Sequence, residues 1–286
     1  MAPAIGFALL SLAFAAALEL SYKRYSTKPR SRGIYLAGIG FVWGSLQLAL
    51  ALYEGTALHW TPTGLYYALA AGVAVAASNL LLIESMTRIE ASLGSTIYRL
   101  NTVVVVVFSF AFLGESIGLL KFVAISFGVA AVLTLSGGVR GGNQLESARF
   151  YFWLAMLASL LRACFGVISK AALNEGVASI VLLLTGAVCW IVGGFLYAAL
   201  RERKVAFSPD NVGYSLLSGV LVFLVVNTLM RGLELGQAST VIPIANLSFV
   251  AVLLISVALR VERLTARKAI AIALAGVCIW LMTAVG

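Results

Sequence analysis

Apolar runs of about twenty residues, separated by short polar breaks, follow one another along almost the whole chain. A helix needs roughly 20 apolar residues to cross the hydrocarbon core of a bilayer. The runs lack the alternation that is typical of barrel strands, and lipid offers backbone polar groups no other partner. The pattern therefore predicts an all-α integral membrane protein with ten transmembrane helices. Their expected bounds are 4–22, 33–53, 64–83, 92–113, 118–135, 149–172, 178–200, 212–232, 238–259 and 266–284.

Composition agrees with this pattern. The chain has 286 residues, of which 62% are hydrophobic and 11% are charged, whereas a soluble domain has about 25% charged residues. The mean hydropathy is +1.03, which excludes a soluble fold. No basic stretch precedes the run 4–22, so we expect a transmembrane span there and not a signal peptide.

The scarcity of catalytic residue types excludes most enzymes. Asp210 is the only aspartate and His59 the only histidine. A paired-aspartate metal site, a histidine-ligated zinc and a Ser-His-Asp triad each need more than this. The three cysteines lie in apolar runs without CxxC spacing. We therefore expect no enzymatic activity and no metal.

Basic residues predict the orientation in the membrane. Of the 20 lysines and arginines, 15 lie in or next to the breaks after the first, third, fifth, seventh and ninth runs, and three lie next to the other breaks. Because basic loops stay in the cytoplasm, both termini are predicted outside, in a multi-pass protein of the cytoplasmic membrane. The net charge of +9 is thus explained by topology, and nucleic-acid binding is not expected.

The sequence also matches itself at an offset of 147 residues. The matched pairs include Trp43 with Trp190, Tyr67 with Tyr214, Glu115 with Glu262 and Lys121 with Lys268. These matches predict two homologous halves of five helices each, residues 1–140 and 148–286. Five is an odd number, so the second half must cross the membrane in the opposite direction. Such inverted repeats are typical of secondary transporters with a substrate site where the halves meet.

Two stretches at this offset resemble a known family. They are Ala91-Ser92, Phe112–Ser116 and Gly128 in the first half, and Ala238-Ser239, Pro243, Val261–Leu264 and Gly276 in the second. With them the chain is similar to ten-helix members of the EamA-type branch of the drug/metabolite transporter superfamily. The resemblance implies secondary transport of small metabolites, mostly export, without a bound cofactor. The chain departs from the family where Thr96 replaces the proline that would match Pro243, and relatives usually have both termini inside.

Three ionisable residues lie within predicted spans, where charge is costly and is therefore a sign of function. They are Glu19, Arg99 and Arg162, which at the 147 offset align with Gly166, Asn246 and Ala15. Since the halves differ at these positions, the shared scaffold does not require the charges. They are candidate substrate ligands, although an ion pair between Glu19 and one of the arginines is an alternative.

Further candidates are polar or aromatic residues in the same spans. Tyr98, next to Arg99, could line a cavity, and Asn79, Asn227 and Asn246 could contact substrate or bond across helices. Pro243 is a candidate hinge or a simple kink. Glu115 and Glu262 end their spans, which favours a helix cap or an ion pair over a role in proton transfer. The candidate substrate-binding residues are therefore Arg162, Arg99, Glu19, Tyr98, Asn79, Asn227 and Asn246.

These features predict a secondary transporter that moves a small organic metabolite by alternating access, in the direction of export. Two arginines within spans favour an amino acid or another carboxylate-bearing compound, and the Glu19 carboxylate could bind an amine. A coupled proton or the substrate gradient would drive transport, and a monomer is compatible with this plan. The alternative is an exchanger of phosphorylated sugars or nucleotide-sugars, or a flippase for a lipid-linked sugar.

The charge distribution gives a first testable prediction. A reporter that fluoresces only in the cytoplasm should stay dark at the C-terminus, because both termini are predicted outside. The same reporter inserted beside Arg140 should fluoresce. Fluorescence of cells that carry the C-terminal fusion is the measurement, and a bright C-terminal fusion would contradict the predicted orientation.

Overall fold

The structure is a computed structural model of the chain, and it describes residues 2–25, 30–56, 60–85, 98, 101–136, 145–203, 209–248, 250–252, 255 and 265–285. Within these residues every regular element is a helix. The helices are α1 (Ala2–Tyr25), α2 (Arg32–Tyr53), α3 (Pro62–Ser85), α5 (Asn101–Leu113), α6 (Leu119–Ser136), α7 (Leu145–Asn174), α8 (Ser179–Tyr197), η1 (Ala198–Glu202), α9 (Pro209–Leu235), α10 (Ala238–Ala245) and α12 (Ala266–Val285).

Six of these helices are long and apolar enough to cross a membrane. They coincide with the first, second, third, sixth, seventh and eighth predicted spans. Among them, α8 continues into the π-helix η1. Shorter apolar stretches lie in α5, α6, α10 and α12. Most of the segment 92–100, including Arg99, lies outside the described residues. The prediction of a helical, multi-pass membrane protein is confirmed.

The ninth predicted span, 238–259, is not one uninterrupted helix. α10 ends at Ala245, and a turn follows at Asn246 and Leu247. Pro243 lies within α10 and has no backbone N–H to donate. Just after it, the Leu247 N–H bonds three residues back, to the Ile244 carbonyl oxygen at 3.0 Å. The turn separates α10 from Ser248 and the helical residues 250–252 that follow it.

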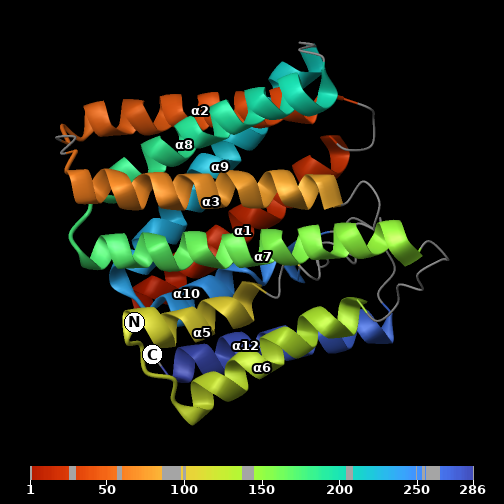
Figure 1. Cartoon of the computed structure of the whole chain (residues 1–286). Helices are drawn as coiled ribbons and strands as arrows, with labels where there is room; N and C mark the ends of the chain where they lie inside the picture. Colours follow the sequence, from red (N-terminus) through yellow and green to blue (C-terminus); the bar gives the residue numbers. More distant parts are fainter. Residues whose placement is uncertain are drawn as a thin grey trace.

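The helices lie side by side, and successive helices run in alternating directions (Figure 1). α1 runs from left to right in that view, while α7 runs from right to left. The two ends of the chain are found at the same end of the helices (Figure 1). Short turns with a positive φ help to reverse the chain, at Gly55 after α2 and at Gly176 after α7.

The main packing contacts all join a helix from before residue 140 to a helix from after it. α2 packs against α8 and α9, and α3 packs against α7 and α8. α1 packs against α9 and α10, α5 packs against α7 and α10, and α6 packs against α12. This set of pairs is unchanged when α1, α2, α3, α5 and α6 are exchanged for α7, α8, α9, α10 and α12 in this order. The two parts of the chain are therefore interleaved and do not form separate lobes.

The crossing of α2 and α8 brings two backbones unusually close. A Cβ atom on Gly194 would lie 2.5 Å from the backbone nitrogen of Ala37 and 2.6 Å from the carbonyl oxygen of Gly33. Further along the same helices, the rings of Trp43 and Trp190 meet edge to face, with centroids 6.1 Å apart. Small residues at such a crossing are typical of helix packing in lipid, where close backbone contact replaces the hydrophobic effect.

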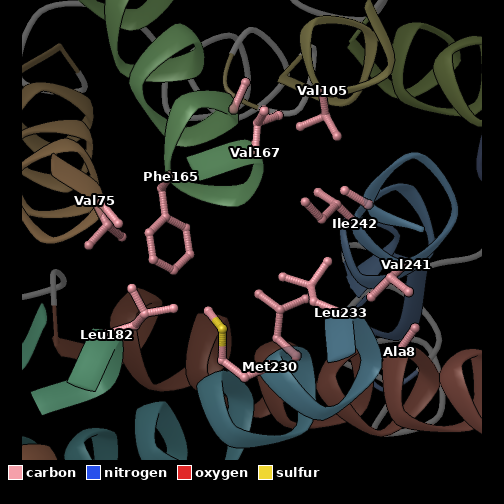
Figure 2. Packing of buried hydrophobic residues seen from close by; sticks show 14 of the residues in the cluster. Ala8, Val75, Val105, Phe165, Val167, Leu182, Met230, Leu233, Val241 and Ile242 are labelled. Atoms are coloured by element: carbon pink, nitrogen blue, oxygen red, sulfur yellow. The ribbon is translucent and has the colours of Figure 1, made fainter. Parts of the chain in front are cut away.

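Apolar side chains from both parts of the chain fill the interior. Figure 2 shows Phe165 of α7 pointing toward Met230 of α9, with Val75 of α3 and Leu182 of α8 beside it. All four side chains are buried. The same cluster extends through α5 and α10 to Ala8 of α1. One continuous core therefore connects the helices that carry the candidate site residues.

At the end of the bundle opposite the termini, carboxylates connect helices through polar bonds. Glu202 of η1 accepts hydrogen bonds from the backbone N–H groups of Arg32 and Gly33, at 2.8 and 3.3 Å, and so caps α2. Glu84 at the end of α3 forms an ion pair with Arg201 at 2.7 Å. Partial burial alone would raise the pKa of Glu84. The hydrogen bonds from Arg201 and Tyr197 outweigh burial, so the pKa of Glu84 lies below its ordinary value.

The α2–α8 crossing predicts that Gly194→Ala destabilises the protein. The added methyl group would overlap the α2 backbone, and overpacking costs about 1–3 kcal/mol, more than the gain of about 1 kcal/mol in helix propensity. The midpoint of thermal unfolding in detergent should fall by several degrees. Gly276→Ala on α12 is the matched control, because nothing lies within 4 Å of its Cβ position. Equal midpoints for the two variants would contradict close packing at Gly194.

Candidate functional site

Glu19 lies in the last two turns of α1 and contacts the segment that follows α10. The hydroxyl of Ser248 donates a hydrogen bond to Glu19 Oε1 at 2.7 Å. Ser248 is buried and comes directly after the turn that ends α10. The break in the ninth predicted span thus gives the Glu19 carboxylate a polar neighbour from the other half of the chain.

Tyr22, which follows Glu19 by three residues on the same face of α1, lies within electrostatic range of several candidate residues. Its hydroxyl interacts electrostatically with Glu19, Arg162, Tyr35 and Tyr98. Its ring also packs edge to face against Tyr35, with centroids 5.9 Å apart. We call Glu19, Tyr22, Tyr98 and Arg162 the Tyr22 site. It combines one carboxylate, one guanidinium and two phenols from α1, α7 and the start of the fourth predicted span.

Arg162 lies in the middle of α7, and its guanidinium carbon is 5.3 Å from the centre of the Phe165 ring. It forms no ion pair with any residue in the described ranges. In particular, the Glu19–Arg162 ion pair that the sequence offered as an alternative is not formed. A guanidinium at this depth needs compensation of at least about 2.5 kcal/mol on insertion scales, and a single aromatic face supplies roughly 0.5–2 kcal/mol.

Tyr98 belongs to the Tyr22 site and also faces α3. Its hydroxyl oxygen is 3.4 Å from that of Ser78, which donates to the Ala158 carbonyl oxygen at 2.7 Å. Asn79, the next residue on α3, uses its amide to bond the carbonyl oxygen of Val75 on its own helix at 2.8 Å. The residue of α3 that contacts Tyr98 is therefore Ser78, next to the predicted candidate Asn79.

Asn246 joins the end of α10 to the start of α5. Its amide donates to Asn101 Oδ1 at 2.5 Å and to Thr102 Oγ1 at 3.0 Å. Asn101 is buried, with 1% of its surface exposed. Asn246 is two residues from Ser248, so the turn after α10 contacts both α5 and the Tyr22 site.

Asn227 forms a reciprocal amide pair with Gln47 and lies in α9. The Asn227 amide donates to Gln47 Oε1 at 2.8 Å, and the Gln47 amide donates back to Asn227 Oδ1 at 3.2 Å. Gln47 is buried. The sequence left two functions open for Asn227, substrate contact and hydrogen bonding across helices. These contacts are hydrogen bonds across helices.

A group of three further tyrosines lies next to the Tyr22 site. Tyr25 stacks on Tyr35 with centroids 3.8 Å apart, and Tyr214 meets Tyr25 edge to face at 5.5 Å. The guanidinium of Arg30 lies over the Tyr25 and Tyr214 rings at 5.3 and 5.0 Å and forms an ion pair with Asp210 at 2.8 Å. We call this group the tyrosine cluster; it joins α1 and α2 to α9 beside the Tyr22 site.

Sequence reasoning missed several of these residues for identifiable reasons. Tyr22 could have been found from its spacing of three residues from Glu19, which puts both on one helix face. Ser248 could not, because its position depends on the break after Ala245. Gln47 lies in the apolar run 33–53 and carries no charge, so that nothing in its sequence context distinguished it. Arg99 lies outside the described residues.

Comparisons with known proteins agree with this fold. Residues 2–137 match the model of the EamA-like transporter family. A solved structure described as "Crystal structure of protein" has a TM-score of 0.87 to this chain at 16% identity, over 100% of this chain and 98% of that one. A likeness at this identity establishes the fold alone. No curated protein matches the chain.

The Gln47–Asn227 pair predicts a specific coupling between two substitutions. Gln47→Leu and Asn227→Leu should each lower stability, because each leaves one buried amide without its partner. The double variant should lose less than the sum of the single losses, by about 0.6–1.7 kcal/mol. Unfolding of the purified variants in detergent measures these losses. Strict additivity would contradict the pair, and a selective loss of transport in Asn227→Leu would indicate substrate contact instead.

Proposed function

Because residues 2–137 belong to the EamA-like transporter family, we propose that this transporter moves an amino acid or another small carboxylate-bearing metabolite by alternating access. The observation that carries the proposal is the Tyr22 site, where a guanidinium without an ion-pair partner in the described ranges and a carboxylate both lie within electrostatic range of one tyrosine. The substrate would supply the negative charge that Arg162 needs at this depth.

Two related halves would allow alternating access, since each can take the conformation of the other. Three observations support such halves. The packing pairs are unchanged when the helices of one half are exchanged for those of the other. The aligned residues Trp43 and Trp190 contact each other, as residues next to a twofold axis would. The family match ends at residue 137, close to the predicted boundary at 140.

Opposite charges at the Tyr22 site favour a substrate that carries both. Arg162 can hold a carboxylate through two parallel hydrogen bonds, and Glu19 can accept a hydrogen bond from an amine. The Tyr22 and Tyr98 hydroxyls offer further donors and acceptors. An α-amino acid has its carboxylate and its ammonium group on the same carbon atom and would match this arrangement.

The cellular setting is part of the proposal. The distribution of basic residues supports a position in the cytoplasmic membrane with both termini outside, and the family resemblance supports export. The Glu19 carboxylate is the group that a coupled proton would occupy. Transport measured with and without an imposed pH gradient distinguishes proton coupling from exchange along the substrate gradient.

This proposal predicts that Arg162→Gln nearly abolishes transport. A charge-assisted hydrogen bond contributes about 1.5–3 kcal/mol, so that the apparent affinity should fall by roughly 10- to 150-fold. Arg162→Lys keeps the charge without the two parallel donors and should lose less. The measurement is counterflow of labelled amino acids into proteoliposomes that are loaded with unlabelled substrate. Normal counterflow by Arg162→Gln would show that the residue does not bind substrate.

Arg231→Gln is the matched control, because the Arg231 side chain is 60% exposed and its guanidinium pairs with Glu234 at the end of α9. It should transport at the parental rate. Failure of Arg162→Gln to accumulate in the membrane would indicate a structural function for the guanidinium. Glu19→Gln should weaken the transport of amino acids more than the transport of simple carboxylates. Equal losses for the two classes of substrate would contradict recognition of the amine by Glu19.

A further inference from the structure

Glu115 lies in the turn between α5 and α6 and caps a helix of the other half of the chain. Gly114 before it has a φ of +64°, which ends α5 and reverses the chain. Glu115 is buried, with 7% of its surface exposed. Its Oε1 accepts the Ala238 N–H at 2.7 Å, and its Oε2 accepts the Ser239 N–H at 3.0 Å and the Ser239 hydroxyl.

These donors are the unpaired N–H groups at the N-terminus of α10. Gln237, the residue that precedes α10, makes no side-chain capping bond of its own. A carboxylate at a helix N-terminus is stabilised by the charge-assisted bonds and by the helix dipole. Glu115 therefore supplies, from the first half of the chain, the cap that α10 lacks within its own half.

Two lysines surround this cap. Lys121 of α6, 2% exposed, donates to Gln237 Oε1 at 2.5 Å. Lys170 of α7 donates to the Leu233 carbonyl oxygen at 2.6 Å. Both ammonium groups interact electrostatically with Glu115. The carboxylate thus connects the α5–α6 turn with the start of α10, and Lys170 beside it connects α7 with the end of α9.

The opposite end of α10 reaches the candidate site. α10 has eight residues and is therefore about 12 Å long. After its last residue, Asn246 bonds to Asn101 and Thr102, and Ser248 bonds to Glu19. A short helix that is held by Glu115 at one end thus fixes the partner of Glu19 at the other. Any movement of α10 changes both sets of bonds together.

We propose that Glu115 is a positioning residue that holds α10 against the first half of the chain, and that its release from Ala238 and Ser239 opens this end of the bundle. The inference rests on the proposed transport function, because it couples opening to the contact between Ser248 and Glu19. It assigns to a carboxylate far from the charged residues of the Tyr22 site a function in the conformational step.

Cysteine labelling without substrate tests this proposal. Val241 in α10 is fully buried, and its side chain lies near Ala8 of α1 (Figure 2). We would place a cysteine at Val241 in a full-length chain whose three native cysteines are replaced by alanine. A small, charged methanethiosulfonate reagent should label it slowly in the parent. Glu115→Ala should accelerate labelling at least tenfold, and Ser239→Ala, which removes one of three donors, should accelerate it less.

Two controls distinguish the release of α10 from a general destabilisation of the helix bundle. A cysteine at Val181 of α8, 1% exposed, should label at the parental rate in every Glu115 variant. Glu234→Gln removes another carboxylate at the same end, one that pairs with Arg231, and should leave labelling at Val241 unchanged. If Glu115→Ala does not fold, Glu115→Gln, which keeps one acceptor oxygen, should give an intermediate acceleration.

The outcomes are distinct from those of the transport assay. Parental labelling of Val241 in Glu115→Ala would overturn the proposal, as would equal acceleration at Val241 and Val181. If the parent protein transports a tested substrate, Glu115→Gln should change the maximal rate of counterflow more than the apparent KM. A larger change in the apparent KM would also contradict the proposal. Accelerated labelling in a chain that transports no tested substrate would support the function of Glu115 while refuting the proposed substrates.

Discussion

The close crossing of α2 and α8 is the constraint on which the arrangement of the other helices depends. In lipid the hydrophobic effect does not hold helices together, so association relies on backbone proximity and interhelical polar contacts. At Gly33 and Gly194 the two backbones leave no room for a side chain. α3 and α9 then pack in the positions beside this pair, and α1 and α7 pack against them in turn. The position of the candidate site follows, because Glu19 and Arg162 lie on α1 and α7.

Polar contacts then connect the halves in a reciprocal way. Glu202, from the second half, caps α2 of the first, and Glu115, from the first half, caps α10 of the second. Between them the Gln47–Asn227 pair joins α2 to α9. The N–H groups of the first turn of a helix have no partner within that helix. Each half therefore satisfies helix ends that the other half exposes, which explains why the halves interleave.

Most of the fold could be predicted from the sequence, because hydropathy reports directly on membrane spans. The predicted bounds 33–53 and 178–200 differ by at most two or three residues from α2 and from α8 with its π-helical extension. The site was less predictable. Glu19 and Arg162 were identified because charge within a span is costly, but the interactions of Glu19 depend on the turn at Asn246. No local sequence pattern predicts that turn, because Pro243 is compatible with both a kinked helix and a helix that ends.

The asymmetry of charge between the halves has a steric basis at one position. Glu19 aligns with Gly166 at the 147 offset, and a Cβ atom on Gly166 would overlap the side chain of Ile242 in α10. A counterpart of Glu19 at this position of α7 would therefore have to displace the end of the Ile242 side chain. One turn earlier the relation is reversed, because Arg162 of α7 aligns with Ala15 of α1. The two helices that align at this offset thus each contribute one charge, of opposite sign. A ligand that pairs with both has one favoured orientation, so that in the proposed transport cycle the two open states are not equivalent even though the frame that produces them is shared.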